Sequence, residues 1–191
     1  MTSFSSDFTS SSPFVGAGFG LDASFVAYWP PEAGCVGMSV SGTVGPGGGS
    51  VSTISAVVTD IARQYLARSI TDGTSLRITE YAVGTAGYDT GNPLTATLAD
   101  PTATALISEV YRDTIDLVET ATLDGTAKSF VARIARNELA AGIGEIALFA
   151  EILSSPFPFE IGSKFMFAVA HQPLNVKTLN HVVSYRVIIA L

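Results

Sequence analysis

Apolar residues recur with helical spacing in the stretch STISAVVTDIARQYLAR. They occupy positions i, i+3, i+4, i+7 and i+11, which are Ile54, Val57, Val58, Ile61 and Tyr65. This spacing places them on one side of an α-helix. Ser52 or Thr53 is suited to cap the start of the helix, and Arg63 and Arg68 suit its C-terminal end. The pattern therefore predicts one amphipathic helix over 54–68.

Farther along the chain, apolar and polar positions alternate with the period of a β-strand. The alternation marks four segments, 75–83, 144–153, 164–170 and 181–191. Because the last of these runs to the final residue, we expect that end of the chain to be tied into a sheet. The two middle strands are expected to pair around the sequence SSPFPFEIGS.

A hairpin is predicted in 114–135, where two alternating segments flank the turn dipeptide Asp124-Gly125. The Gly-, Thr-, Asn- and Pro-rich segment 84–101 predicts a long loop. Segment 102–113 is ambiguous, and a helical turn that leads into an extended segment is one interpretation of it. We predict a mainly β (α+β) fold, with an antiparallel, sandwich-like core and the single helix packed against it.

The first fifty residues follow neither period, although they are rich in large aromatic groups. These are Phe4, Phe8, Phe14, Phe19, Phe25, Tyr28 and Trp29. The Gly-rich segment 43–50 has the composition of a flexible linker. We predict an extended Gly/Ser/Phe-rich arm and linker over 1–50 and a β-rich core domain over 51–191, which should fold without the arm. The arm is expected to become ordered on a partner or neighbouring subunit; the alternative is a small β-subdomain on its own chain.

The composition favours a protein that hides surface against other chains. Apolar residues make up 47% and charged residues 14% of the 191 residues, against about 25% charged residues in ordinary soluble domains. No apolar run approaches the roughly 18 residues of a membrane helix. A compact monomer with an uncharged surface is the alternative. The net charge of −7 argues against nonspecific nucleic-acid binding, and Cys35, the single cysteine, excludes an intramolecular disulfide.

Side-chain patterns that carry chemistry are weak. His171 and His181 lie ten residues apart, which is not the spacing of a helical metal-binding pair. Asp89 and Asp100 could bind calcium in the long loop, but turn formation explains them more simply. No spacing among the other acids singles out a glycosidase-like pair. We predict a non-enzyme without catalytic, metal or cofactor sites.

Glu145 is a carboxylate inside the apolar stretch GIGEIALFAE, and a buried carboxylate without a partner is costly. It is either a general acid with a perturbed pKa or a structural group. The candidates for structural ion pairs are Glu145, Glu109, Arg112, Arg133 and Arg136, and the three arginines are the possible partners of Glu145. An arginine fork or backbone N–H groups could satisfy the carboxylate. We favour a structural role, as an ion pair or as a tie for a loop.

The order of several segments resembles tailed-bacteriophage virion proteins of the tail-collar or tail-fibre attachment type. The segments are ITEYAVGTAG, TATALISEVYRD, the Asp-Gly hairpin, GIGEIALFAE, GSKFMFAVAHQPLNVKT and SYRVIIAL, and they span 76–191. The positions that match the family pattern are Gly84, Glu109, Arg112, Glu145, Phe149 and Lys177. Ala147 departs from it, because glycine is frequent there.

The resemblance implies a structural virion component without catalysis, assembled in the host bacterial cytoplasm. Such a chain would be an adaptor or fibre-base subunit at the tail, collar, neck or baseplate, forming a trimer or a ring-embedded homo-oligomer. Its partners would be other virion proteins, met through the arm, the sheet edges or the 154–163 loop. The alternatives are a capsid decoration or cement protein, whose arm lies across neighbouring subunits, and a carbohydrate-binding or -cleaving fibre module.

Overall fold

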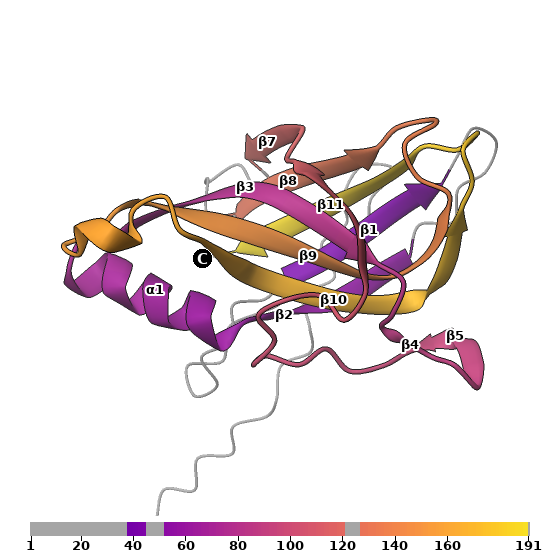
Figure 1. The fold of residues 1–191 in the computed structure, drawn as a ribbon, viewed down its shortest axis with the longest axis horizontal. Coiled ribbons are helices and arrows are strands. Elements are labelled where there is room, and N and C mark those ends of the chain that lie inside the picture. The colour runs from indigo at the N-terminus through magenta and orange to yellow at the C-terminus, as the bar shows by residue number, and fades with distance from the viewer. Residues whose placement is uncertain (1–37, 45–51, 121–126, 191) are drawn as a thin grey trace, which may run out of the picture.

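The computed structural model describes residues 38–44, 52–120 and 127–190 (Figure 1). One α-helix, α1 (Asp60–Thr71), and a short 3₁₀ turn, η1 (Pro158–Glu160), accompany the strands of these ranges. The strands are β1 (Met38–Val44), β2 (Ser52–Val58), β3 (Ser75–Gly84), β4 (Tyr88–Asp89), β5 (Asn92–Ala96), β6 (Glu109–Thr114), β7 (Leu117–Thr120), β8 (Ala127–Ile134), β9 (Ala141–Ser154), β10 (Lys164–Lys177) and β11 (Val183–Ala190). The predicted mainly β fold with a single helix is confirmed.

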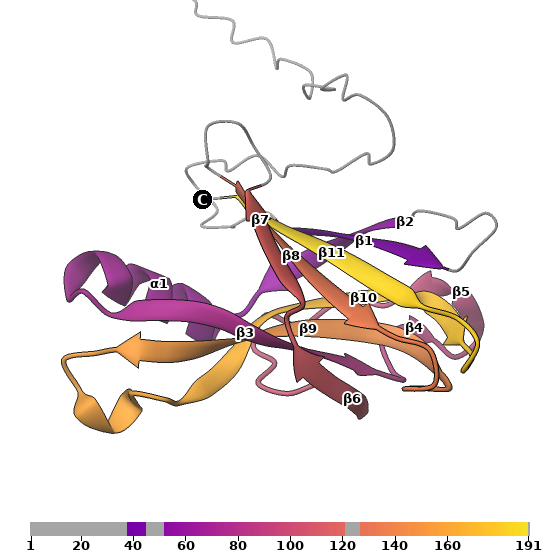
Figure 2. The same cartoon turned by 90° about the horizontal axis from the view of Figure 1, so that it is seen from above.

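A nine-stranded antiparallel sheet in the order β6-β3-β9-β10-β2-β1-β11-β8-β7 forms the body of the molecule. The sheet curls, so that β3, β9 and β10 lie across from β1, β11 and β8 (Figure 2). Two residues carry the chain from β6 to β7: Ile115 N donates to Thr79 O of β3, and Asp116 N donates to Val131 O of β8, both at 3.0 Å. At this corner the chain therefore passes from one layer to the other, which gives the expected sandwich-like arrangement.

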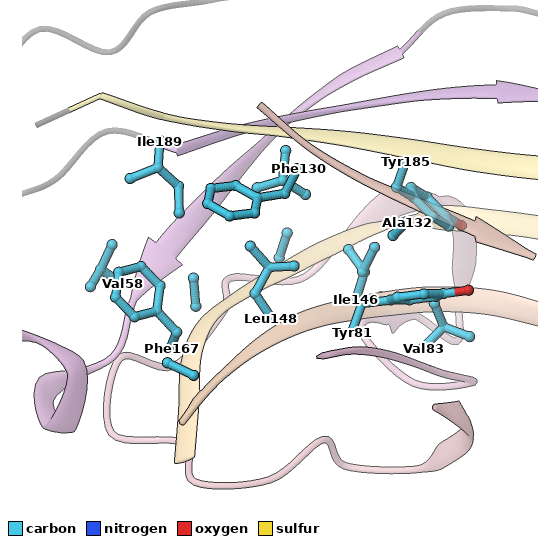
Figure 3. Packing of buried hydrophobic residues seen from close by; sticks show 14 of the residues in the cluster. Val58, Tyr81, Val83, Phe130, Ala132, Ile146, Leu148, Phe167, Tyr185 and Ile189 are labelled. Carbon is cyan, nitrogen blue, oxygen red and sulfur yellow. The ribbon is translucent and has the colours of Figure 1, made fainter. Parts of the chain in front are cut away.

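The core fills the space between the two layers (Figure 3). One layer contributes Phe130, Ala132, Tyr185 and Ile189, and the other Tyr81, Ile146, Leu148 and Phe167. Burying each large apolar side chain contributes about 1.5–3 kcal/mol. Buried hydroxyl groups add polar ties: Tyr81 donates to Arg133 O at 2.7 Å, and Gln172 Nε2 donates to the Tyr185 hydroxyl at 2.9 Å. These bonds fix how the layers face each other.

The start of the predicted helix is wrong, because residues 52–58 form β2 and α1 begins at Asp60. Ile54, Val57 and Val58 are β-branched, and such residues favour a strand where a sheet can receive them. Their spacing fits a helix face as well, so periodicity alone cannot decide. The remaining part of the prediction is confirmed, since α1 covers the rest of that segment and continues to Thr71.

Thr59 marks the change from strand to helix. Its Oγ1 accepts a hydrogen bond from Ala62 N at 3.2 Å, as an N-cap does, and its hydroxyl donates to Met166 O at 2.6 Å. The cap is thus held against β10, and the expected caps at positions 52 and 53 are wrong. Arg68 lies in the last turn as expected, whereas Arg63 lies in the first turn beside Asp60.

The boundary predicted at residue 50 is also wrong. Residues 38–44 form β1, which pairs with β2 on one side and β11 on the other and therefore lies well inside the sheet. The sequence MSVSGTV does alternate apolar and polar residues, but its Gly-rich flanks favoured a linker. The aromatic residues of the arm, Phe4, Phe8, Phe14, Phe19, Phe25, Tyr28 and Trp29, lie outside the described residues.

The other strand predictions hold. The 75–83 segment is β3, the middle pair is β9 and β10, and the final segment is β11. β7 and β8 pair as the predicted hairpin, whose Asp124-Gly125 turn lies outside the described residues. The long loop contains the small β4–β5 hairpin, and the ambiguous segment becomes irregular chain followed by β6. No helix in the described part of the chain has the length and apolarity needed to cross a membrane.

Candidate functional site

Glu145 fastens a loop of its own chain to the sheet. It lies on β9, opposite Gly84 of β3, and its side chain is fully buried. One carboxylate oxygen, Oε2, accepts from Ile107 N at 3.0 Å, and Oε1 accepts from Ser108 N at 2.8 Å. Of the two kinds of partner that the sequence left open, backbone N–H groups are therefore the ones observed. We call this arrangement the Glu145 clasp.

Two glycines, Gly84 and Gly144, leave room for the clasp because they carry no side chain. A Cβ on Gly84 would lie 2.2 Å from Glu145 Oε1, and one on Gly144 would lie 2.1 Å from Ala86 O. Real Cβ atoms do not approach other heavy atoms so closely, and a packed interior cannot absorb the overlap cheaply. The glycines of GIGE and of AVG thus allow the 85–108 loop to lie directly against β9.

The clasped loop covers the outer face of the layer formed by β3, β9 and β10. Its buried Leu106 packs in a second apolar cluster that the sheet completes with Ala82, Ala147, Phe149, Met166 and Val169. Pro101 O accepts from Asp60 N at 2.8 Å, which ties the loop to the start of α1. The loop is therefore a packed part of the fold, while Leu94, Leu98 and Ile107 on it remain exposed.

Arg112 belongs to a surface ion pair. Its Nη2 lies 2.7 Å from Glu109 Oε2, and its guanidinium lies 3.7 Å from the centre of the Phe149 ring. Glu80 bridges Arg112 and Lys164, and its hydrogen bond from Lys164 lowers the pKa of the Glu80 carboxyl. The Glu109–Arg112 candidate pair is present in the structure, whereas sequence reasoning missed Glu80, which comes from the neighbouring strand.

The other two arginine candidates are not brought to Glu145. Arg133 is engaged through its backbone, since its N–H donates to Asp116 Oδ2 at 2.7 Å and its carbonyl accepts from Tyr81. Arg136 lies exposed just beyond the end of β8. Lys177, which the resemblance singled out, is buried, and its Nζ donates to Leu139 O at 3.0 Å. Burial lowers the pKa of the Lys177 ammonium group.

An exposed apolar surface lies between β9 and β10. We call it the aromatic tip; its exposed apolar members are Leu153, Phe157, Phe159 and Ile161. Phe157 is 47% exposed and Phe159 is 81% exposed. Their ring centres lie 6.0 Å apart, and η1 carries the second ring at the turn. Nothing in the described part of the chain covers these side chains.

Arg68 of α1 clamps the aromatic tip. Its guanidinium makes a bidentate contact with Glu160, from Nη1 to Oε1 at 3.0 Å and from Nη2 to Oε2 at 2.8 Å. Ser155 Oγ donates to the same carboxylate at 2.6 Å. The guanidinium also lies 5.0 Å from the Tyr65 ring centre and 5.1 Å from that of Phe157. The hydrogen bond from Arg68 lowers the pKa of the Glu160 carboxyl.

Two of the acidic residues considered for calcium shape turns instead. Asp89 Oδ1 accepts from Gly91 N at 2.8 Å, and Asp100 Oδ1 accepts from both the N–H and the hydroxyl of Thr102. No group of three or more metal-ligating side chains occurs in the ranges that the structure describes.

The two histidines each meet a threonine. His171 Nδ1 lies 2.9 Å from Thr97 Oγ1, and His181 Nδ1 lies 3.2 Å from Thr178 Oγ1. His171 belongs to β10 and His181 to the segment before β11, and the two histidines have different threonine partners. These threonine contacts give both imidazoles an ordinary structural role.

Comparison with known proteins adds no family, because no protein-family model matches this chain and a search of curated proteins finds no match either. The chemical reading therefore depends on the geometry. The Glu145 clasp and the Arg68–Glu160 ion pair hold two loops in place. The exposed large side chains of these loops are mostly apolar. That arrangement suits binding to another macromolecule.

Proposed function

We propose that the protein is a structural component of a tailed-phage virion, an adaptor or fibre-base subunit at the tail, collar, neck or baseplate. It assembles by protein–protein contacts and links an appendage to the particle. The observation that carries the proposal is the aromatic tip, whose phenylalanines are exposed although Arg68 and Glu160 hold their loop in one conformation. Exposed apolar groups held in this way are typical of interaction sites.

Fixing the tip in advance favours tight association. An interface must otherwise order its loops and side chains on binding, at about 0.5–1.5 kcal/mol for each side chain that becomes fixed. The bidentate contact of Arg68 with Glu160 and the flanking rings of Tyr65 and Phe157 order the tip during folding, before any partner binds. Large aromatic side chains at the centre of a contact supply much of its energy. Phe157 and Phe159 are therefore proposed as the anchors.

The clasped loop offers a second apolar surface. Leu94 is 79% exposed, Leu98 is 96% exposed and Ile107 is 73% exposed. Isolated exposed leucines need no explanation, but these lie on a loop that Glu145 fastens to the sheet. A subunit that contacts neighbours on two sides needs two such surfaces, which fits a trimer or a ring. The low share of charged residues and the order of the phage-like segments support the same proposal.

The test replaces the tip anchors and follows incorporation into particles. Phe157→Ser combined with Phe159→Ser should leave folding intact, because neither side chain is buried, and should abolish incorporation. The matched control, Val176→Ser with Leu179→Ser, removes two exposed apolar side chains from the region at the far end of β10. Quantitative mass spectrometry of purified particles measures both. Normal incorporation of the tip variant would sink the proposal.

A further inference from the structure

Met38, the first residue that the structure describes, lies two strands from Ala170 near the middle of β10, and the aromatic tip lies just before the start of β10. Met38 pairs with Ala56, and Ala56 pairs with Ala170 of β10. Lys164, which adjoins the tip, lies six residues before that point on the same strand. Two strand spacings of about 4.8 Å and six residues at about 3.3 Å give a separation on the order of 20 Å.

The chain before Met38 carries groups that match the tip chemically. Aromatic residues occur along its whole length, from Phe4 to Trp29. About seven extended residues would cover the distance to the molecule's own tip. Phe14 lies 24 residues before Met38, which corresponds to as much as about 80 Å of extended chain.

That reach exceeds the size of the folded part. A compact domain of this length has a radius of gyration of about 15 Å and is roughly 40 Å across. Phe25, Tyr28 and Trp29, 9 to 13 residues before Met38, have enough chain to reach the molecule's own tip, so the more distant Phe4, Phe8 and Phe14 are not needed for that contact. Phe4, Phe8 and Phe14 come 24 or more residues before Met38, which is enough chain to reach a neighbouring molecule.

We propose that Phe4, Phe8 and Phe14 of one copy dock on the aromatic tip of a second copy of this chain. Their rings pack against Phe157 and Phe159 in offset or edge-to-face contacts. Because the arm and the tip are different surfaces, the contact is head-to-tail, and such contacts close into rings when the rotation between copies allows it. This inference rests on the proposed assembly function and names its first partner.

The experiment uses full-length chains in analytical ultracentrifugation. The arm variant carries serine in place of Phe4, Phe8 and Phe14, and the tip variant carries serine in place of Phe157 and Phe159. The unmodified chain should form oligomers, and each variant alone should be monomeric. An equimolar mixture should give a 1:1 dimer, because one intact arm then meets one intact tip. The Val176→Ser, Leu179→Ser control should assemble like the unmodified chain.

A second measurement keeps the test decisive if the tip variant fails to fold, as judged by circular dichroism. On a Cys35→Ser background, chains with Phe8→Cys and chains with Phe159→Cys are mixed and oxidised. A disulfide-linked heterodimer should form in preference to either homodimer. Equal formation of all three dimers, or no crosslink at all, would contradict docking of the arm on the tip.

Several results would overturn the inference. An unmodified chain that is monomeric, an arm variant that still assembles, or a mixture that stays monomeric each excludes docking of the arm on a second copy. The particle assay separates this failure from failure of the proposed function. If the arm variant enters particles normally and the tip variant does not, the tip binds another virion protein and the assembly function stands.

Discussion

Replacing Glu145 by glutamine tests whether the buried carboxylate is a structural clasp. The side chain keeps its size but has one acceptor oxygen in place of two. The structure shows two backbone donors, Ile107 N at 3.0 Å and Ser108 N at 2.8 Å. One of them would face the amide NH₂ group and lose its partner. An N–H group left unsatisfied against this buried side chain costs about 1–3 kcal/mol, which corresponds to about a 5- to 150-fold change in the unfolding equilibrium.

Urea unfolding of the variant and the unmodified chain measures this free energy directly. In thermal unfolding, each kcal/mol lost should lower the melting temperature by about 2–4 °C for a chain of this size. Hydrogen exchange should also accelerate at the Ile107 and Ser108 amides, because these bonds fasten the loop. The matched control is Glu151→Gln on the same strand. Its carboxylate lies 3.8 Å from an exposed Arg77, so its loss should cost at most about 1 kcal/mol.

Two results would refute this reasoning. A Glu145→Gln variant as stable as the Glu151→Gln control would show that the two backbone bonds contribute little. A variant that folds and assembles normally but loses a measurable hydrolytic activity would show that Glu145 is a catalytic acid. If Glu145 is a structural clasp, Glu145→Gln should be less stable than Glu151→Gln, and no hydrolytic activity should depend on Glu145.

Further predictions address the backbone, the sheet and the core. Gly84→Ala should cost about 1–3 kcal/mol in urea unfolding, because its Cβ would overlap the buried carboxylate, whereas Gly91→Ala, at a site with no contact closer than 3.4 Å, should change stability little. A chain lacking 1–37 should unfold cooperatively like the full chain, and one lacking 1–50 should not fold because β1 is gone; equal behaviour would contradict the sheet order. Burial raises the pKa of Tyr185, so the buried neutral hydroxyl stabilises the fold fully below about pH 10. Above that pH the free energy of unfolding should fall by up to about 1.4 kcal/mol per pH unit. Tyr185→Phe should make this fall less steep, and an unchanged pH dependence of the free energy of unfolding would contradict the prediction.

The strands could be predicted because their signal is local. Alternation within 75–83 and 181–191 needs no knowledge of the neighbouring strands. The start of α1 was mispredicted because Ile54 and Val58 are four residues apart, a spacing that fits both the helical and the strand period, and Val57 completes the helical pattern. Pairing with β1 and β10 decides between them, and both partners are distant in sequence.

The candidate site was predictable only in part. The sequence identified Glu145 as a group that needs partners, but backbone amides have no side-chain signature. The available signals were Gly84 and Gly144, which make room for the loop. The exposed phenylalanines of the tip were visible in SSPFPFEIGS, whereas the clamp between Arg68 and Glu160 joins residues 92 positions apart. Such pairs follow from the fold and not from spacing.

A cryo-electron microscopy map of the purified particle that contains this chain tests the central claim most directly. The proposal predicts symmetric copies at the tail, collar, neck or baseplate, with Phe157 and Phe159 buried against a neighbouring chain. Hundreds of copies spread over the capsid surface would instead indicate a cement protein. A particle without the chain, or one in which the aromatic tip faces solvent in every copy, would contradict the proposal.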